Sequence, residues 1–169
     1  AAERIKKLYP NMKLLIILRN PIDRAWSQFQ HNKRLLREEL SFEEALKMEE
    51  IRMENELKIL EKDPHYKTFS LWFHSYLSMG RYYEQIKKWS KIFSKEQILI
   101  INSDELSKNT QEVMKTVFRF LNVHAYEIKN ISKFNIGGYK ENMSKKTREQ
   151  LIDYFKIHNE DLEKYLSKE

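Results

Sequence analysis

The sequence predicts an α/β fold in which a parallel sheet is flanked by helices, with helix as the larger part. Two segments, residues 13–18 and 98–101, have the length of buried strands, and both are continuously apolar after Lys13. Neither run alternates apolar with polar side chains, which is typical of strands covered on both faces in a parallel sheet. Most of the remaining chain shows helical spacing of apolar residues. Two clear strands make only part of such a sheet, so the fold is predicted as partial.

The first predicted strand leads into a helix over residues 21–37. Asn20 is a good N-cap and Pro21 suits the first helical position. A second helix is predicted over residues 41–62, because Ser41-Phe-Glu-Glu44 forms a capping box. Asp63-Pro64-His65 ends that helix, and a loop to residue 68 follows.

Helical character resumes at Ser70 and continues after Gly80. The second strand follows at residues 98–101 and ends in a polar turn at 102–105. Two further helices are predicted, one over residues 110–121 and one that begins after Ser144. Gly137-Gly138 indicates a tight loop between them, although an ordinary turn explains the pair equally well.

Composition limits the function classes. The chain has 169 residues, 41% hydrophobic and 33% charged, which predicts one globular domain over residues 1–169. It has no cysteine, so disulfides, thiolate metal sites and cysteine nucleophiles are excluded, and a cytoplasmic location is favoured. The five histidines show no metal-ligand spacing, and no apolar run is long enough to cross a bilayer. A net charge of +6 favours an anionic partner.

The junction between the first strand and its helix predicts a phosphate site. Arg19 follows the strand, Asn20-Pro21 opens the helix, and Ser27 lies on the second helical turn. A helix start offers backbone N–H groups and the positive end of a dipole to an anion. The guanidinium of Arg19 matches phosphate oxygens, and the Ser27 hydroxyl is a further donor. The chain is therefore predicted to hold a phosphorylated nucleotide.

The segment LIILRNPIDRAWSQF resembles the 3′-phosphate-binding segment of sulfotransferases that use 3′-phosphoadenosine 5′-phosphosulfate. In that family the arginine at the strand end and a serine eight residues later hold the 3′-phosphate, which implies this role for Arg19 and Ser27. The stretch MGRYYEQIKKWSKIFSKEQILIINSDEL is similar to the helix, strand and acidic turn of the bacterial and heparan-sulfate-type branch. NIGGYKENMSKKTREQL resembles the loop that closes over the nucleotide phosphates, which implies contacts from Gly138 and Lys140.

The resemblance implies a P-loop NTPase-like fold, of which this chain is similar to the C-terminal portion. The implied reaction transfers a sulfuryl group from 3′-phosphoadenosine 5′-phosphosulfate to a hydroxyl or amine acceptor, leaving adenosine 3′,5′-bisphosphate. The partners are thus the nucleotide and an acceptor that the sequence does not identify, with no nucleic acid, no metal and no membrane segment. Lys62 to Thr68, with His65, is the local candidate for an acceptor contact.

Three departures from the family pattern shape the expected activity. The family's glycine-rich loop for the 5′-phosphosulfate is absent, because the only glycines are Gly80, Gly137 and Gly138. No residue here matches the family's general base, so no catalytic residue is assigned. Ser103 stands where cytosolic relatives place a tyrosine against adenine. We therefore expect this chain by itself to bind nucleotide without catalysing transfer.

Two other functions compete with this prediction. The basic segment 129–149 carries six lysines and arginines against two glutamates, which suits a non-catalytic nucleic-acid-binding module. A helical interaction module is the second alternative, but it leaves Arg19, Asn20 and Pro21 unexplained. Residue by residue, Arg19 could simply pair with a carboxylate such as Asp23, and Ser27 could be an ordinary surface serine.

Overall fold

The computed structural model describes residues 2–63, 65–129 and 142–167. It divides into two compact units, and each is described by itself below. The strand-bearing unit comprises Ala1–Arg19 and Tyr83–Ile136, and the helical unit comprises Asn20–Tyr82 and Gly137–Glu169. Among the described residues no helix has the length and apolar content needed to cross a bilayer. The prediction of a single domain stays a prediction.

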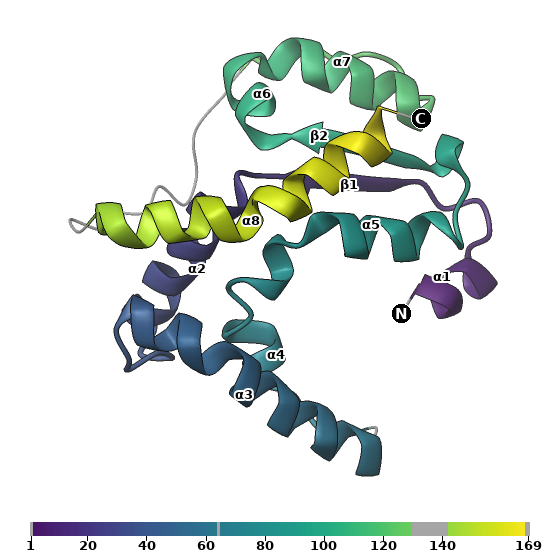
Figure 1. The fold of residues 1–169 in the computed structure, drawn as a ribbon. Coiled ribbons are helices and arrows are strands. Elements are labelled where there is room, and N and C mark those ends of the chain that lie inside the picture. The colour runs from purple at the N-terminus through teal and green to yellow at the C-terminus, as the bar shows by residue number, and fades with distance from the viewer. Residues whose placement is uncertain (1, 64, 130–141, 168–169) are drawn as a thin grey trace. The chain divides into compact units, whose positions relative to one another are not determined.

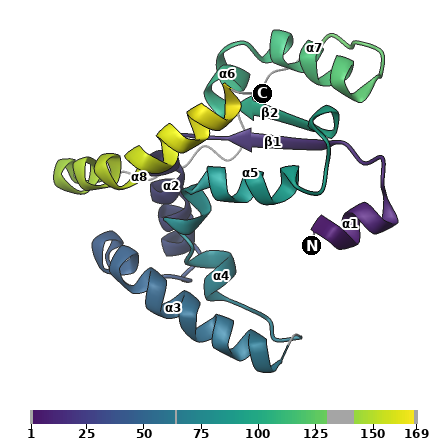
Figure 2. The ribbon, with the colours of Figure 1, turned by 45° about the vertical axis from the view of Figure 1, so that its right-hand side comes forward.

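The strand-bearing unit is built on a parallel pair of strands, β1 and β2 (Figure 1). Leu14 pairs with Ile98 and Leu18 pairs with Asn102, so both strands end at the same edge. Figures 1 and 2 both draw α5 beside β1 and α7 beside β2. The elements are α1 (Ala2–Leu8), β1 (Leu14–Leu18), α5 (Tyr82–Ser90), η2 (Lys95–Gln97), β2 (Ile98–Asn102), α6 (Ser103–Lys108) and α7 (Thr110–Leu121).

Side-chain hydrogen bonds tie the approach to β1 to the start of β2. Gln97 donates its Nε2 to the carbonyl oxygens of Pro10 at 2.8 Å and Met12 at 2.9 Å. Lys6 Nζ donates to Gln97 Oε1 at 2.6 Å. One amide side chain therefore satisfies two loop carbonyls that have no strand partner.

The sequence prediction that both strands are buried on both faces is wrong for β1. Leu15 is 43% exposed and Ile17 is 56% exposed, while Leu14, Ile16 and Leu18 are half-buried. This alternation follows the pleat of a strand, which sends successive side chains to opposite faces. One face of β1 is thus open to solvent although every residue on it is apolar.

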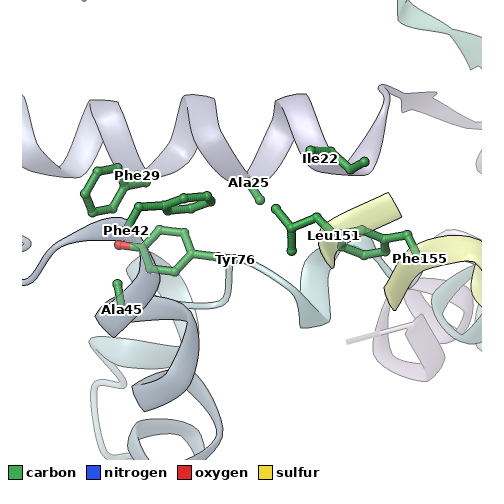
Figure 3. Close-up of a cluster of buried hydrophobic side chains, with 8 residues drawn as sticks. All are labelled: Ile22, Ala25, Phe29, Phe42, Ala45, Tyr76, Leu151 and Phe155. Carbon is green, nitrogen blue, oxygen red and sulfur yellow. The ribbon is translucent and has the colours of Figure 1, made fainter. Parts of the chain in front are cut away.

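The helical unit holds the larger hydrophobic core, shown in Figure 3. Side chains from α2, α3 and α8 meet Tyr76 in this cluster: Ile22, Ala25, Phe29, Phe42, Ala45, Leu151 and Phe155. The elements of the unit are α2 (Pro21–Arg34), α3 (Phe42–Lys62), α4 (Ser70–Phe73), η1 (Ser78–Gly80) and α8 (Lys145–Leu166).

Gly80 marks the closest approach of backbone to this core. A Cβ on Gly80 would lie 2.7 Å from a ring carbon of Phe155 and 3.0 Å from the Cβ of Pro21. The absence of a side chain therefore lets η1 fit between the start of α2 and α8.

Two of the predicted boundaries differ from the structure in a way that affects the elements next to the strands. The helix predicted over residues 21–37 ends at Arg34, because Leu36 adopts a left-handed conformation with φ of 55°. The residues predicted as a polar turn after β2 form the short helix α6 instead. Asn102 caps this helix, since its Oδ1 accepts from Asp104 N and Glu105 N.

Candidate nucleotide-binding site

The start of α2 is a capped helix terminus directly after β1. Asn20 Oδ1 accepts hydrogen bonds from Ile22 N at 3.0 Å and Asp23 N at 3.3 Å. Pro21 has no N–H, and Arg24 N donates to the Asn20 carbonyl at 2.9 Å. The expectation of unpaired N–H groups at this terminus is therefore wrong for residues 21–24. An anion here would be held by side chains and the helix dipole rather than by these backbone donors.

Arg19 is exposed and lies one residue beyond the last pair of the β-ladder. No ion pair of Arg19 occurs among the described residues. Asp23, the carboxylate that could have neutralised it, pairs with Arg148 at 2.8 Å. Within the described part of the chain, its guanidinium is thus left to an external anion.

Ser27 is half-buried on the second turn of α2. Residues 20, 23 and 27 follow one another at intervals of three and four, so they share one face of the helix. Arg19 belongs to the strand-bearing unit and Ser27 to the helical unit. The link between the two rests on the eight-residue spacing along the chain.

The other predicted site residues fall in two groups. Gly138 and Lys140 lie outside the described residues, so their predicted roles stay predictions. Ser103, which the resemblance places at the position of a tyrosine in cytosolic relatives, is half-buried and begins α6. His65 is exposed in the loop after α3. Searching the described parts of the chain finds no cluster of three metal-binding side chains.

A cavity of about 780 Å³ opens on another side of α2. Ser27 is absent from its walls, so it is not the predicted phosphate site. The residues that line it are Trp26, Phe29, Gln30, Lys33, Leu40, Ser41, Phe42, Glu43, Asn142 and Ser144.

A buried polar network behind α2 was not predicted from the sequence. Glu38, whose side chain is fully buried, accepts from Arg52 Nη1 at 2.7 Å and from the Tyr76 hydroxyl at 3.0 Å. Asn32 Nδ2 donates to the Tyr76 hydroxyl at 3.2 Å. The partners lie 14 to 44 residues apart, so no local spacing could have revealed them.

The network keeps its acid charged and its phenol neutral. Burial acts to raise the pKa of Glu38, but the hydrogen bonds from Arg52, Leu40 N and Tyr76 outweigh it and lower that pKa. Burial also raises the pKa of Tyr76 well above that of an exposed tyrosine. Tyr76 is therefore a hydrogen-bond donor at neutral pH, which suits a structural anchor for α2 rather than a proton-transfer group.

Arg24 makes hydrogen bonds within the helical unit. Its Nη1 donates to the Tyr76 carbonyl at 3.1 Å and its Nη2 donates to Gln28 Oε1 at 2.7 Å. Burial lowers the pKa of the Arg24 guanidinium. The second arginine of the segment thus supports α2, in contrast to exposed Arg19.

Comparison with known proteins shows the family of the chain. The sequence model of the family described as "Sulfotransferase domain" matches residues 4–169. Bifunctional heparan sulfate N-deacetylase/N-sulfotransferase 1 of Caenorhabditis briggsae is 28% identical over 188 residues, which covers 99% of this chain and 21% of that protein. Carbohydrate sulfotransferase 15 of Rattus norvegicus is 29% identical over 124 residues, covering 70% of this chain and 22% of that protein.

A solved structure extends the similarity to the fold. The crystal structure of a sulfotransferase from Alicyclobacillus acidocaldarius matches with a TM-score of 0.75 at 31% identity. The match covers 98% of this chain and 59% of that chain. The chain thus spans about a fifth of the curated relatives named here and somewhat more than half of the solved one.

Proposed function

The chain belongs to the sulfotransferase domain family, and we propose that it supplies the 3′-phosphate grip of an enzyme that transfers a sulfuryl group. The donor is 3′-phosphoadenosine 5′-phosphosulfate, and the acceptor is a hydroxyl or an amine. The observation that carries the proposal is an exposed arginine at the end of β1, followed by a capped helix with Ser27 on its second turn.

Side chains do the binding in this proposal. The Arg19 guanidinium pairs with the 3′-phosphate, and the Ser27 hydroxyl donates a hydrogen bond to the same group. The first-turn N–H groups of α2 are occupied by Asn20, which supports a side-chain grip over a backbone cradle. Gly138 and Lys140, which lie outside the described residues, are further phosphate contacts in this proposal, as the family resemblance implies.

Binding the nucleotide is only part of the reaction. Sulfuryl transfer needs an in-line nucleophile, a base for its proton, and cations on the charge that develops at the leaving phosphate. The described residues offer no base in contact with the proposed grip that we can assign. We therefore propose that this chain by itself binds the donor and product without turnover.

Calorimetric titration with adenosine 3′,5′-bisphosphate tests the grip, with adenosine 5′-monophosphate as the control ligand. The bisphosphate is expected to bind more tightly, since only it carries the 3′-phosphate. Arg19→Ala is expected to weaken bisphosphate binding by about 2–3 kcal/mol, the range of a lost charge-assisted hydrogen bond. Adenosine 5′-monophosphate binding should change little.

Arg119→Ala is the matched control, because Arg119 is an exposed arginine of the same unit on α7. It should leave both affinities unchanged. Equal affinity of the wild-type chain for the two nucleotides would contradict the proposal. Binding that falls steeply with salt and ignores the 3′-phosphate would instead support a nucleic-acid-binding function.

A further inference from the structure

Asp23 conflicts with a phosphate at the start of α2. It lies four residues before Ser27, on the same helical face and about 6 Å away between Cβ atoms at ordinary helix spacing. A carboxylate in the first turn stabilises the helix through its dipole. The same carboxylate repels a phosphate that binds one turn further along.

Arg148 is the residue that cancels this charge. Its Nη1 lies 2.8 Å from Asp23 Oδ1, and both side chains are less than half exposed. Arg24, next to Asp23 in the chain, directs its two Nη atoms to the Tyr76 carbonyl and to Gln28 Oε1, and the described residues show no ion pair between Arg24 and Asp23. Arg148 is therefore the ion-pair partner that the described residues give to Asp23.

Side-chain packing and a hydrogen bond hold the first turn of α8, which carries Arg148, against the rest of the helical unit. Thr147 is 3% exposed, and its hydroxyl donates to Glu43 on α3. Leu151 and Phe155, one and two turns further along α8, lie in the core cluster with Ile22 of α2 (Figure 3). Packing thus fixes the first turn of α8, from which the partly exposed Arg148 side chain reaches Asp23.

We propose that Arg148 is an electrostatic positioning residue for nucleotide binding. By neutralising Asp23, it lets α2 keep a helix-stabilising carboxylate and still accept a dianionic 3′-phosphate at Ser27. This inference rests on the proposed function and adds a residue from the other end of the chain to it. Arg148 does not touch the nucleotide; it acts through Asp23.

Four variants and two ligands test the proposal by calorimetry. Arg148→Gln should weaken adenosine 3′,5′-bisphosphate binding about tenfold, because it exposes an uncompensated carboxylate to the phosphate. Asp23→Asn should bind at least as tightly as the wild-type chain. The double variant Asp23→Asn with Arg148→Gln should return to within about twofold of wild type. Arg148→Lys should retain most of the affinity, since it keeps the charge.

Controls separate this electrostatic role from simple docking of α8. Lys145→Gln removes a positive charge from the same helical turn, where Lys145 faces Glu149 at 3.9 Å, and should have no effect. Adenosine 5′-monophosphate affinity should be the same for all variants. Raising the salt concentration should shrink the loss in Arg148→Gln, because solvent-exposed charges are screened. Thermal unfolding of each variant shows that it is folded.

The outcomes are distinct. Rescue in the double variant supports the proposal. A double variant as weak as Arg148→Gln overturns it, because the effect would then come from α8 docking. No loss in Arg148→Gln also overturns it. If the wild-type chain fails to prefer the bisphosphate, the proposed function itself fails, and the variants are not needed to show it.

Discussion

In the strand-bearing unit the described side chains that are fully buried are apolar, whereas the helical unit buries charged and polar groups beside its aromatic cluster. Ile86, Phe93, Ile101 and Val117 are the buried residues of the first unit. The second unit buries seven polar or charged residues: Asn32, Glu38, Glu49, Glu56, His74, Ser75 and Thr147. The two units therefore differ in what accepts hydrogen bonds from their backbone N–H groups.

Backbone pairing in the parallel ladder explains the first case, and the N–H groups at the starts of two short helices explain the second. Strands β1 and β2 pair their own N–H and C=O groups. The segment from Phe69 to Ser78 has no ladder, and glutamates from α3 accept its backbone N–H groups instead. Glu56 accepts from residues 69, 70 and 71, and Glu49 accepts from residues 77 and 78.

The spacing on α3 makes this possible. Glu49 and Glu56 are seven residues apart, which places them on one helical face. Each carboxylate accepts the N–H groups at the start of a short helix, Glu56 at α4 and Glu49 at η1. The helical unit consequently depends on ionised acids in a way that the strand-bearing unit does not.

Among the variants that test this dependence on buried acids, Glu38→Gln should destabilise the protein most. One amide N–H₂ would face donors from Arg52, Tyr76 or Leu40 N in a fully buried position. We expect a loss of about 2–4 kcal/mol in the free energy of unfolding, as for breaking a buried ion pair whose partner keeps some solvent contact. Urea denaturation measures it. Glu39→Gln, at an exposed neighbouring position, should change stability by less than about 0.5 kcal/mol. Equal losses in the two variants would show that burial of the acid does not matter.

Acid should open the helical unit before the strand-bearing one. Burial acts to raise the pKa of Glu56, but three backbone hydrogen bonds lower it, and the pKa of Glu38 is also lowered. A lowered folded-state pKa contributes stability above the unfolded pKa of about 4.3, and this is lost as pH falls through the folded value. Below about pH 4, rate-corrected hydrogen exchange should lose protection at residues 69–78 first.

Residues 98–102 of β2 are the internal control for that titration, because their hydrogen bonds run between backbone groups. Simultaneous loss of protection in both regions would show that buried acids do not set the acid stability of the helical unit.

The asparagine caps offer the smallest and most direct comparison. Asn20 caps the 14-residue α2 in one unit, and Asn102 caps the six-residue α6 in the other. Asn20→Ala should cost about 1 kcal/mol of stability, typical of a lost N-cap. Asn102→Ala should cost less, because a helix of fewer than two turns contributes little that a cap can protect. Thermal unfolding of the two variants ranks them, and the reverse order would contradict this reasoning.

Sequence reasoning predicted several elements correctly from local signals, although it missed the short helix α6 and the end of α2. Helix α7 has the predicted bounds 110–121, α8 begins after Ser144, and the Ser41 capping box opens α3. The parallel α/β class, the strand-to-helix junction and the family all follow from residues close together in the chain. Caps, turns and apolar periodicity depend on residues a few positions apart, so the structure they produce can be predicted from the sequence.

Tertiary structure decided what depends on distant partners. The open face of β1, the occupation of the α2 N–H groups by Asn20, and the pairing of Asp23 with Arg148 were not foreseen. The sequence offers Asp23 as a partner for Arg19, whereas the packing of α8 pairs Asp23 with a cation 125 residues away. By itself the sequence determined the elements and the candidate grip; the fold determined which charges are cancelled there, because an ion pair depends on proximity in space rather than along the chain.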